Sequence, residues 1–229
     1  MVDAIPVAIE AHGQTDVGRV RETNEDQFLI ANLARSMIVE TTSISVEDQS
    51  WLHGVLQGTL LLVADGMGGE HAGDRASRLV VEAITTYVLN AMPWFYRLDS
   101  KFGGDLAEML RAGVARCEEA ISRYKSENGL EQRMGSTLTM SYVLWPNMYL
   151  THVGDSRCYV LRQGKFDKIT RDHTMAQLMI DKGEGISAAE AEAQFGHVIW
   201  NAVGAESSRP ALPEVTKYAL EFGDTVLLC

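Results

Sequence analysis

The chain has 229 residues, 46% of them hydrophobic, which is enough for one large domain or two small ones with a sizeable core. Its 31 acidic and 20 basic residues give a formal net charge of -11, which argues against a surface that binds nucleic acid or an anionic membrane. The widely spaced cysteines at positions 117, 158 and 229 predict no disulfide framework or zinc motif, and with no signal peptide or long apolar run they indicate reduced thiols in a cytoplasmic protein.

The first third of the chain predicts strands around an acidic motif. Residues 5–16 and 26–32 have strand character, and the polar stretch 34–58 predicts an irregular loop. Five apolar residues in a row, Leu60 to Ala64, then predict a strand over 59–64 that is buried on both faces. This strand delivers Asp65 to a glycine-rich loop, a pattern that suits either a hard metal ion or a simple Asp-Gly turn.

Two amphipathic helices are predicted next. In residues 72–91 and again in 104–125, apolar side chains recur on one helical face. Each helix therefore has one apolar side that has to pack against another element.

Closely spaced strands dominate the rest of the chain. Short connectors between them predict antiparallel hairpins, and the capping box that starts at Ser187 predicts a second short helix after one at 173–183. The absence of a linker predicts one domain over 1–229, and the order of elements favours antiparallel sheets covered by helices. The predicted strands are 136–144, 148–153, 156–162, 165–169, 214–219 and 225–228.

Carboxylates gather at Glu25-Asp26, at Asp65 and at Asp155. Neighbouring strand residues point to opposite faces, so we expect one of Glu25 and Asp26 to coordinate a metal directly and the other to act through water or stay structural. Oxygen ligands without a His-Glu-x-x-His motif favour Mg²⁺ or Mn²⁺ over zinc. Each cluster also has a structural interpretation, as a solvated strand end or a turn, and the spacing does not name a reaction.

Taken in order, the motifs resemble those of the metal-dependent protein serine/threonine phosphatases, the protein phosphatase 2C (PPM) family in its bacterial form. Seven matches in family order cover nearly the whole chain. They are Asp16-x-Gly18-x-x-Arg21-x-x-Asn24-Glu25-Asp26, Ala64-Asp65-Gly66-Met67-Gly68-Gly69, Met134-Gly135-Ser136-Thr137-Leu138, His152-Val153-Gly154-Asp155-Ser156-Arg157, Thr170-Arg171-Asp172-His173-Thr174, Asn201-Ala202-Val203-Gly204 and Gly223–Cys229.

The resemblance implies an α+β fold in which two antiparallel β-sheets pack as a sandwich with helices on the outside, in four α/β/β/α layers. It also implies hydrolysis of phosphoserine and phosphothreonine by a metal-activated water at two Mn²⁺ or Mg²⁺ ions, with a third possible. Residues 175–200 would form a flap beside the site. The implied roles are metal binding by Glu25, Asp65, the Gly66 carbonyl and Asp155, retention of metal-bound water by Asp26, and a grip on the substrate phosphate by Arg21.

Two departures from the family pattern matter. Met67 stands where eukaryotic members carry a histidine proposed as general acid, so a metal-bound water or His71 would have to supply that proton. The chain also ends at Cys229, ahead of two aspartates that complete the family's first metal site. We therefore expect a C-terminally incomplete domain without its last strand and helix, in a form that is weakly active or inactive.

Two other functions are considered. The first is a non-catalytic phosphatase-like module that binds phosphoproteins or regulates a partner, against which the retained Arg21, Glu25, Asp26 and Asp65 argue. The second is nucleotide binding, which the absence of a Walker lysine after Gly66–Gly73 disfavours. For the phosphatase, the expected partners are phosphorylated proteins and a cognate Ser/Thr kinase, with no nucleic acid and no membrane, and we expect a monomer.

Overall fold

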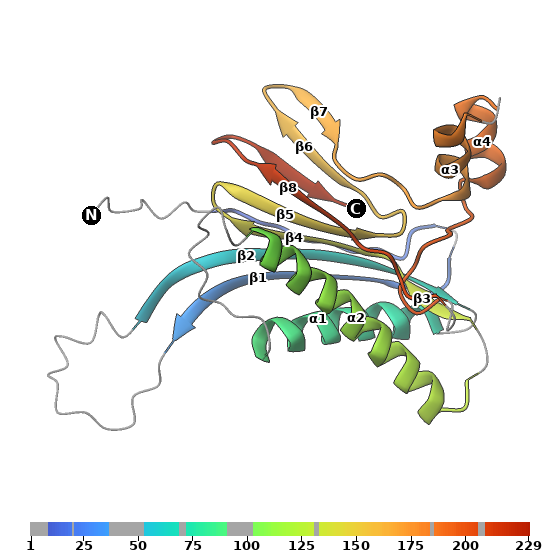
Figure 1. Ribbon diagram of the computed structural model, residues 1–229, viewed down its shortest axis with the longest axis horizontal. Coiled ribbons are helices and arrows are strands. Elements are labelled where there is room, and N and C mark those ends of the chain that lie inside the picture. The colour runs from blue at the N-terminus through green and yellow to red at the C-terminus, as the bar shows by residue number, and fades with distance from the viewer. Residues whose placement is uncertain are drawn as a thin grey trace, which may run out of the picture.

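The computed structural model describes residues 9–19, 21–36, 53–68, 72–90, 103–130, 133–183, 186–205 and 209–229. Within these ranges the chain forms two antiparallel sheets and four helices. The larger sheet has the order β1-β2-β4-β5-β8 with β3 paired to β2, and the smaller has the order β7-β6-β9. Figure 1 shows helices α1 and α2 on one side of the larger sheet and the smaller sheet on the other.

The larger sheet consists of β1 (Asp26–Ser36), β2 (His53–Gly68), β3 (Met134–Ser136), β4 (Leu138–Leu144), β5 (Asn147–Val153) and β8 (Glu214–Ala219). The smaller sheet consists of β6 (Cys158–Arg162), β7 (Lys165–Lys168) and β9 (Thr225–Leu228). The helices are α1 (Ala72–Asn90), α2 (Gly103–Glu127), α3 (Met175–Lys182) and α4 (Ala188–Phe195).

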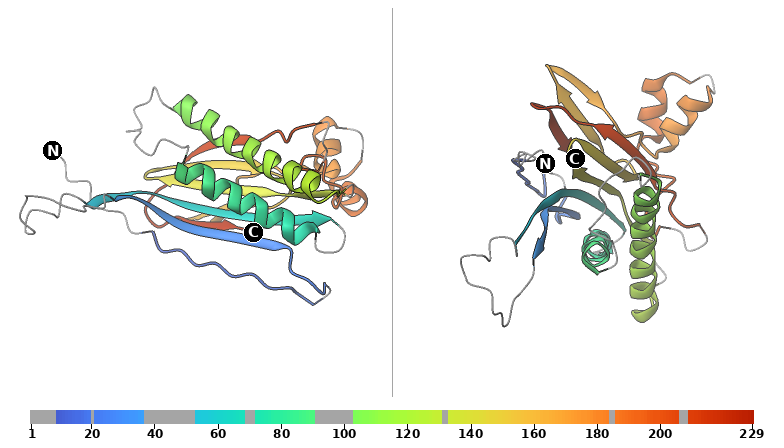
Figure 2. Two further views of the ribbon diagram at one scale, coloured as in Figure 1. Left: turned by 90° about the horizontal axis from the view of Figure 1, so that it is seen from below. Right: turned by 60° about the vertical axis from the view of Figure 1, so that its left-hand side comes forward.

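The main core lies between the larger sheet and the helices α1 and α2. Strand β2 contributes every second residue of its apolar run, Leu60, Leu62 and Ala64, each at most 2% exposed. Every second residue of a strand points to the same face. Here that face packs on the apolar stripes that recur about every 3.6 residues along the helices. Figure 2 shows α1 and α2 running side by side across this face. The helix residues in this core include Leu79, Val80, Ile84 and Val88 of α1 and Leu106, Leu110, Val114, Cys117 and Ile121 of α2.

A second, smaller core lies between the two sheets. Strands β4 and β5 are buried on both faces, because their odd and even positions meet different layers. Met140 and Tyr142 face the helices, while Val143, Met148 and Leu150 pack with Cys158 and Val160 of the smaller sheet. The burial includes polar side chains, because Thr139 and Ser141 of β4 and Thr151 and His152 of β5 are buried as well.

Helices α3 and α4 form a separate pair at one end of the molecule, beyond the smaller sheet (Figure 1). The Ser187 capping box is present: its hydroxyl accepts from the Glu190 N–H, and the Glu190 carboxylate accepts from the Ser187 N–H. The segment begins and ends at one neck, where Met175 N–H donates to the Val198 carbonyl and Trp200 N–H to the His173 carbonyl. Residues 175–200 therefore leave the body of the protein and return to it at the same point.

The predicted fold class is confirmed: two antiparallel sheets pack face to face with helices outside. In the described part of the chain, one outer face of this sandwich carries the long helices α1 and α2, and α3 and α4 lie at its end (Figure 1). The two long helices and the strands from 134 onward lie within a few residues of their predicted positions. No helix of the described residues combines the length and apolar character needed to cross a membrane.

Two expectations for the N-terminal third are wrong. The described part of predicted strand 5–16 is not a strand, because Ile9 alone packs against a core cluster while residues 10–12 and 14–16 are exposed. The predicted loop 34–58 is strand at both ends, since β1 continues to Ser36 and β2 begins at His53. Register shifts near Leu33 and Ala34 break the alternation that a strand prediction depends on. Residues 37–52 lie outside the described part of the chain.

The helix–sheet core predicts a contrast between two positions on α1. Ile84→Ala is expected to lower the free energy of unfolding by about 2–5 kcal/mol, because Ile84 is fully buried and its removal leaves a cavity. Leu89→Ala on the same helix is the control, because Leu89 is 59% exposed and should cost little. Urea unfolding followed by circular dichroism measures both. Equal losses would contradict the assignment of this helix face to the core.

Candidate metal centre

Asp26 and Asp65 lie directly opposite each other on neighbouring strands. They are paired residues in the antiparallel register of β1 and β2, so their side chains project from the same face of the sheet. Leu60, Leu62 and Ala64 of β2 occupy the face that packs on the helices, which places Asp65 on the face toward the smaller sheet. The alternation of the strand thus separates the carboxylates from the helix-side core.

A third carboxylate, Asp155, joins them from the turn between β5 and β6. The three side chains line one cavity of about 400 Å³ at the edge of the sandwich, together with Asp16 and Ser156. The cavity is open to solvent, and Asp26 and Asp65 are both exposed. A concave surface with converging carboxylates is a reasonable cation site.

The carboxylates disturb each other's ionisation. Partial burial, together with the negative charges of Asp26 and Asp155, raises the pKa of Asp65 to about 6, while the Arg21 charge opposes the rise. Burial also raises the pKa of Asp155. A divalent cation would relieve this repulsion, so the donor chemistry of the cavity fits a hard metal ion held by oxygen ligands.

The main chain around Asp65 is held from two sides. On one side, Thr137 N–H donates to the Asp65 carbonyl at 2.8 Å and Asp65 N–H donates to the Thr137 hydroxyl at 2.9 Å. On the other, the Glu25 carbonyl accepts from Gly66 N–H at 3.1 Å and from the Ser77 hydroxyl at 2.6 Å. The start of β1, the end of β2 and helix α1 are therefore joined at one carbonyl oxygen.

Gly66 has to be glycine for a steric reason. A Cβ atom at this position would overlap the backbone carbonyl of Gly73 in the first turn of α1. The close approach brings the helix N-terminus against the Asp65 turn. The glycine that the sequence placed in a loop is in fact the last part of β2 and a packing contact.

Glu25 lies on the opposite side from Asp26, as strand alternation predicts. Its carboxylate occupies the space beside Gly73, in the first turn of α1, where a Cβ atom would otherwise lie, and Arg21 Nη1 lies 3.2 Å from Glu25 Oε2. A helix N-terminus stabilises a carboxylate. The structure thus brings Asp26, Asp65 and Asp155 together, and it places Glu25 and the exposed Arg21 beside the helix instead of in the cavity.

In their present conformations, no three acidic, histidine or cysteine side chains of the described residues are close enough to hold one ion. The described carboxylates therefore share a cavity without forming a finished coordination shell. His71 and Gly69, which belong to the predicted loop, lie outside the described part of the chain.

A buried polar cluster supports the Asp155 turn from beneath. The Thr139 hydroxyl lies 2.9 Å from both His152 Nδ1 and the Ser156 carbonyl oxygen. His173 Nδ1 accepts from Gly154 N–H at 3.1 Å and contacts Asn201 Nδ2 at 2.8 Å. Burial lowers the pKa of His152 to about 4, which keeps its imidazole neutral.

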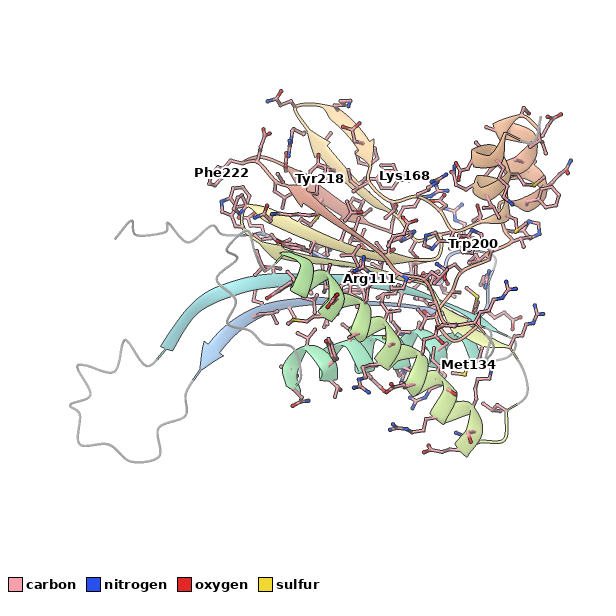
Figure 3. All side chains as sticks on the ribbon, in the orientation of Figure 1. Arg111, Met134, Lys168, Trp200, Tyr218 and Phe222 are labelled. Atoms are coloured by element: carbon pink, nitrogen blue, oxygen red, sulfur yellow. The ribbon has the colours of Figure 1, made fainter. Side chains whose placement is uncertain are left out.

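The same turn is connected to the neck of segment 175–200. Arg157 donates from Nε and Nη2 to one oxygen of the buried Asp172, at 2.9 and 2.6 Å. The ring centroid of Trp200 lies 5.2 Å from that of His173, and Figure 3 shows Trp200 below helices α3 and α4. The turn that carries Asp155 thus connects the acidic cavity with the base of the α3–α4 pair.

Three hydroxyl residues in this site were not predicted. The sequence patterns assign no role to Ser77, nor to Thr137 and Ser156, although the last two fall inside motifs of the family resemblance. Ser77 carries a detectable signal, because it is a polar residue on the buried face of an otherwise amphipathic helix. The partners of Thr137 and Ser156 lie far away in the sequence, so no local pattern reveals them.

Comparisons with known proteins place this chain in a family. The family model described as Protein phosphatase 2C matches residues 34–178. The serine/threonine protein phosphatase PstP of Mycobacterium tuberculosis is 37% identical over 172 residues, covering 74% of this chain and 30% of the relative. The chain therefore spans less than a third of that relative's length. The serine/threonine phosphatase stp of Listeria monocytogenes is 25% identical over 224 residues, covering 96% of this chain and 76% of the relative.

Solved structures agree with the fold. The catalytic domain of PstP in complex with two manganese ions superposes with a TM-score of 0.59 at 30% identity, covering 89% of this chain and 76% of that one. A serine/threonine phosphatase from S. agalactiae gives a TM-score of 0.70 at 23% identity, over 94% of this chain and 76% of that one, which supports the fold alone.

The crowded carboxylates predict that the metal-free protein becomes less stable as the pH rises. The pKa of Asp65 rises from 3.8 to about 6 on folding, so the protonated form stabilises the fold at low pH. That stability is lost as the pH rises through about 6. Asp65→Asn should therefore melt at a higher temperature than the unmodified chain at pH 7.5, with the difference vanishing near pH 4. Thermal unfolding with a chelator measures this.

The matched control for this prediction is Asp167→Asn, which removes the same charge from β7, where Asp167 pairs with Lys165. It should show no such gain. A gain from Asp65→Asn that is as large at pH 4 as at pH 7.5 would contradict the electrostatic explanation.

Proposed function

This chain belongs to the protein phosphatase 2C family, and on that premise we propose that it hydrolyses phosphoserine and phosphothreonine in proteins with divalent metal ions. The observation that carries the proposal is the cavity in which Asp26, Asp65 and Asp155 converge. In a chain of net charge -11, three carboxylates repel a phosphate dianion. Substrate can approach this cavity productively only when cations neutralise it, so the activity should depend strictly on metal.

The oxygen ligands that line the cavity suit hard divalent ions. Asp65, the Gly66 carbonyl and Asp155 would hold Mn²⁺ or Mg²⁺, and Glu25 would join them by turning from Arg21 toward the cavity. When bound, the ions supply Lewis-acid charge and lower the pKa of coordinated water. Asp26, whose carboxylate projects beside that of Asp65, would accept a hydrogen bond from the attacking water and orient it.

Arg21 would hold the substrate phosphate. Its side chain is 73% exposed and lies next to Glu25, at the side of the site where α1 begins. A planar guanidinium can donate two parallel hydrogen bonds to a phosphate, which fixes the phosphorus relative to the cavity. The Glu25 carboxylate at present occupies one of these donors.

Several further features belong to the same proposal. Residues 175–200, which leave and re-enter at one neck, would act as a flap over bound phosphoprotein. The chain would act as a single catalytic domain and a monomer in the cytoplasm, opposing a Ser/Thr kinase in signalling.

A non-catalytic binding module remains the second candidate. The observation in its favour is that Glu25 faces Arg21 and the helix instead of the cavity. Calorimetric titration with Mn²⁺ separates the two functions, because a phosphoprotein-binding module need not take up the metal.

The main test is Mn²⁺-dependent hydrolysis of a phosphothreonine peptide. Asp65→Asn should lower turnover by about 100-fold or more, because it removes a charge that holds the metal ions. Those ions stabilise the transition state by several kcal/mol. Asp167→Asn should retain activity, and a chelator should abolish it. Release of phosphate is measured with and without metal. Turnover that survives both the chelator and Asp65→Asn would refute the proposed site.

Arg21 predicts a separate kinetic signature. Arg21→Ala should raise KM for the phosphopeptide about 10-fold or more, because a charged hydrogen-bond donor to the phosphate is lost, with a smaller effect from Arg21→Lys. Steady-state kinetics at saturating Mn²⁺ measure it. Arg116→Ala on α2, a similarly exposed arginine, is the control. An unchanged KM in Arg21→Ala would remove Arg21 from the binding site.

A further inference from the structure

The strand pairing opposite Asp65 has one unusual hydrogen bond. The register of β2 with β4 and β3, through Val63 with Thr139 and Gly66 with Ser136, places Asp65 opposite Thr137. At a hydrogen-bonded position of a regular antiparallel ladder, the two opposed residues exchange two backbone bonds. Here Thr137 N–H donates to the Asp65 carbonyl, but Asp65 N–H donates to the Thr137 side-chain hydroxyl at 2.9 Å. A side-chain oxygen has replaced a backbone acceptor.

The same hydroxyl has a second partner. Thr137 Oγ1 lies 2.7 Å from Ser156 Oγ, and Ser156 directly follows Asp155. Thr137 is fully buried and Ser156 is 9% exposed, so water does not compete effectively for these bonds. One buried hydroxyl therefore contacts the main chain of Asp65 and, through Ser156, the turn that carries Asp155.

Resting on the function proposed above, we propose that Thr137 and Ser156 form a hydroxyl link that holds Asp65 and Asp155 at a fixed spacing for divalent-cation binding. Thr137 is a positioning residue, because its hydroxyl bonds the backbone of Asp65 and the side chain that follows Asp155, and acts through them on the two carboxylates. Two carboxylates that share a cavity repel each other, and the link opposes their separation.

The chemistry of the link specifies which substitutions it tolerates. Serine keeps the hydroxyl that accepts from Asp65 N–H and pairs with Ser156. Valine keeps the shape but removes both bonds and leaves the Asp65 N–H without its acceptor. Thr151 offers a matched control, because it is equally buried in β5 and its hydroxyl makes no hydrogen bond among the described residues. Thr151→Val thus removes a buried hydroxyl without removing a link.

The first experiment compares Thr137→Val, Thr137→Ser and Thr151→Val by calorimetric titration with Mn²⁺ and by amide hydrogen exchange in the metal-free state. Thr137→Val should weaken Mn²⁺ binding by about 10- to 100-fold, the usual cost of losing a partner of a metal ligand. It should also speed exchange at the Asp65 amide by roughly tenfold, as loss of one hydrogen bond implies. Thr137→Ser should restore both, and Thr151→Val should leave both unchanged. Mn²⁺ affinity within twofold between Thr137→Val and Thr151→Val would overturn the proposal.

A second comparison keeps the test valid if Thr137→Val does not fold. Ser156→Ala removes only the far end of the link and should weaken Mn²⁺ binding while leaving exchange at Asp65 slow. Mn²⁺ affinity of Ser156→Ala within twofold of the unmodified chain would overturn the link. Where Thr137→Val folds, a double-mutant cycle with Ser156→Ala should give strongly non-additive losses, and additive losses overturn the link. A wild-type chain that binds Mn²⁺ without hydrolysing phosphopeptide would refute the proposed hydrolysis but not the link.

Discussion

The hydrogen bonding at the end of β2 is the constraint on which the rest of the site depends. Asp65 is held at its carbonyl and amide by Thr137, and the next residue, Gly66, donates to the Glu25 carbonyl. Ser77 of α1 donates to that same carbonyl. Four segments far apart in the sequence therefore meet within one residue of the central carboxylate. Leu60, Leu62 and Ala64 pack the strand against the helices, while Leu61 and Val63 on the other face are only partly buried, so the carboxylate has a defined position at the edge of the core.

The fold brings together charges that oppose its own stability. Asp26, Asp65 and Asp155 share a cavity, and their repulsion adds to burial in raising the pKa of Asp65. Such an arrangement is expected at a functional site, where binding of a cation offsets the repulsion between the carboxylates. The turn that carries Asp155 is supported by a buried cluster of Thr139, His152 and His173. Such support matters because coordination depends on small displacements of ligand atoms.

Prediction from sequence succeeded where a periodic pattern spans a whole element. The stripes of α1 and α2, the capping box at Ser187 and the strands from 134 onward all have local signals. It failed at residues 34–36 and 53–58, where bulges disrupt the alternation, and at residues 9–16, which are extended but bury too little to form a strand. The opposite orientations of Glu25 and Asp26 followed from strand alternation alone, and the structure has them on opposite sides.

By itself, the sequence determined the residue types and their order: an apolar strand ending in Asp65, two further acidic motifs, and the family resemblance that joins them. It could do so because strand and helix periods and glycine-rich turns are local properties of the chain. The tertiary structure alone decided which carboxylates meet, since Asp26, Asp65 and Asp155 come from three separate strand ends. It also decided that Glu25 rests at the N-terminus of α1 and that Thr137 holds the Asp65 backbone. Those facts depend on register and packing between distant segments, which no local pattern encodes.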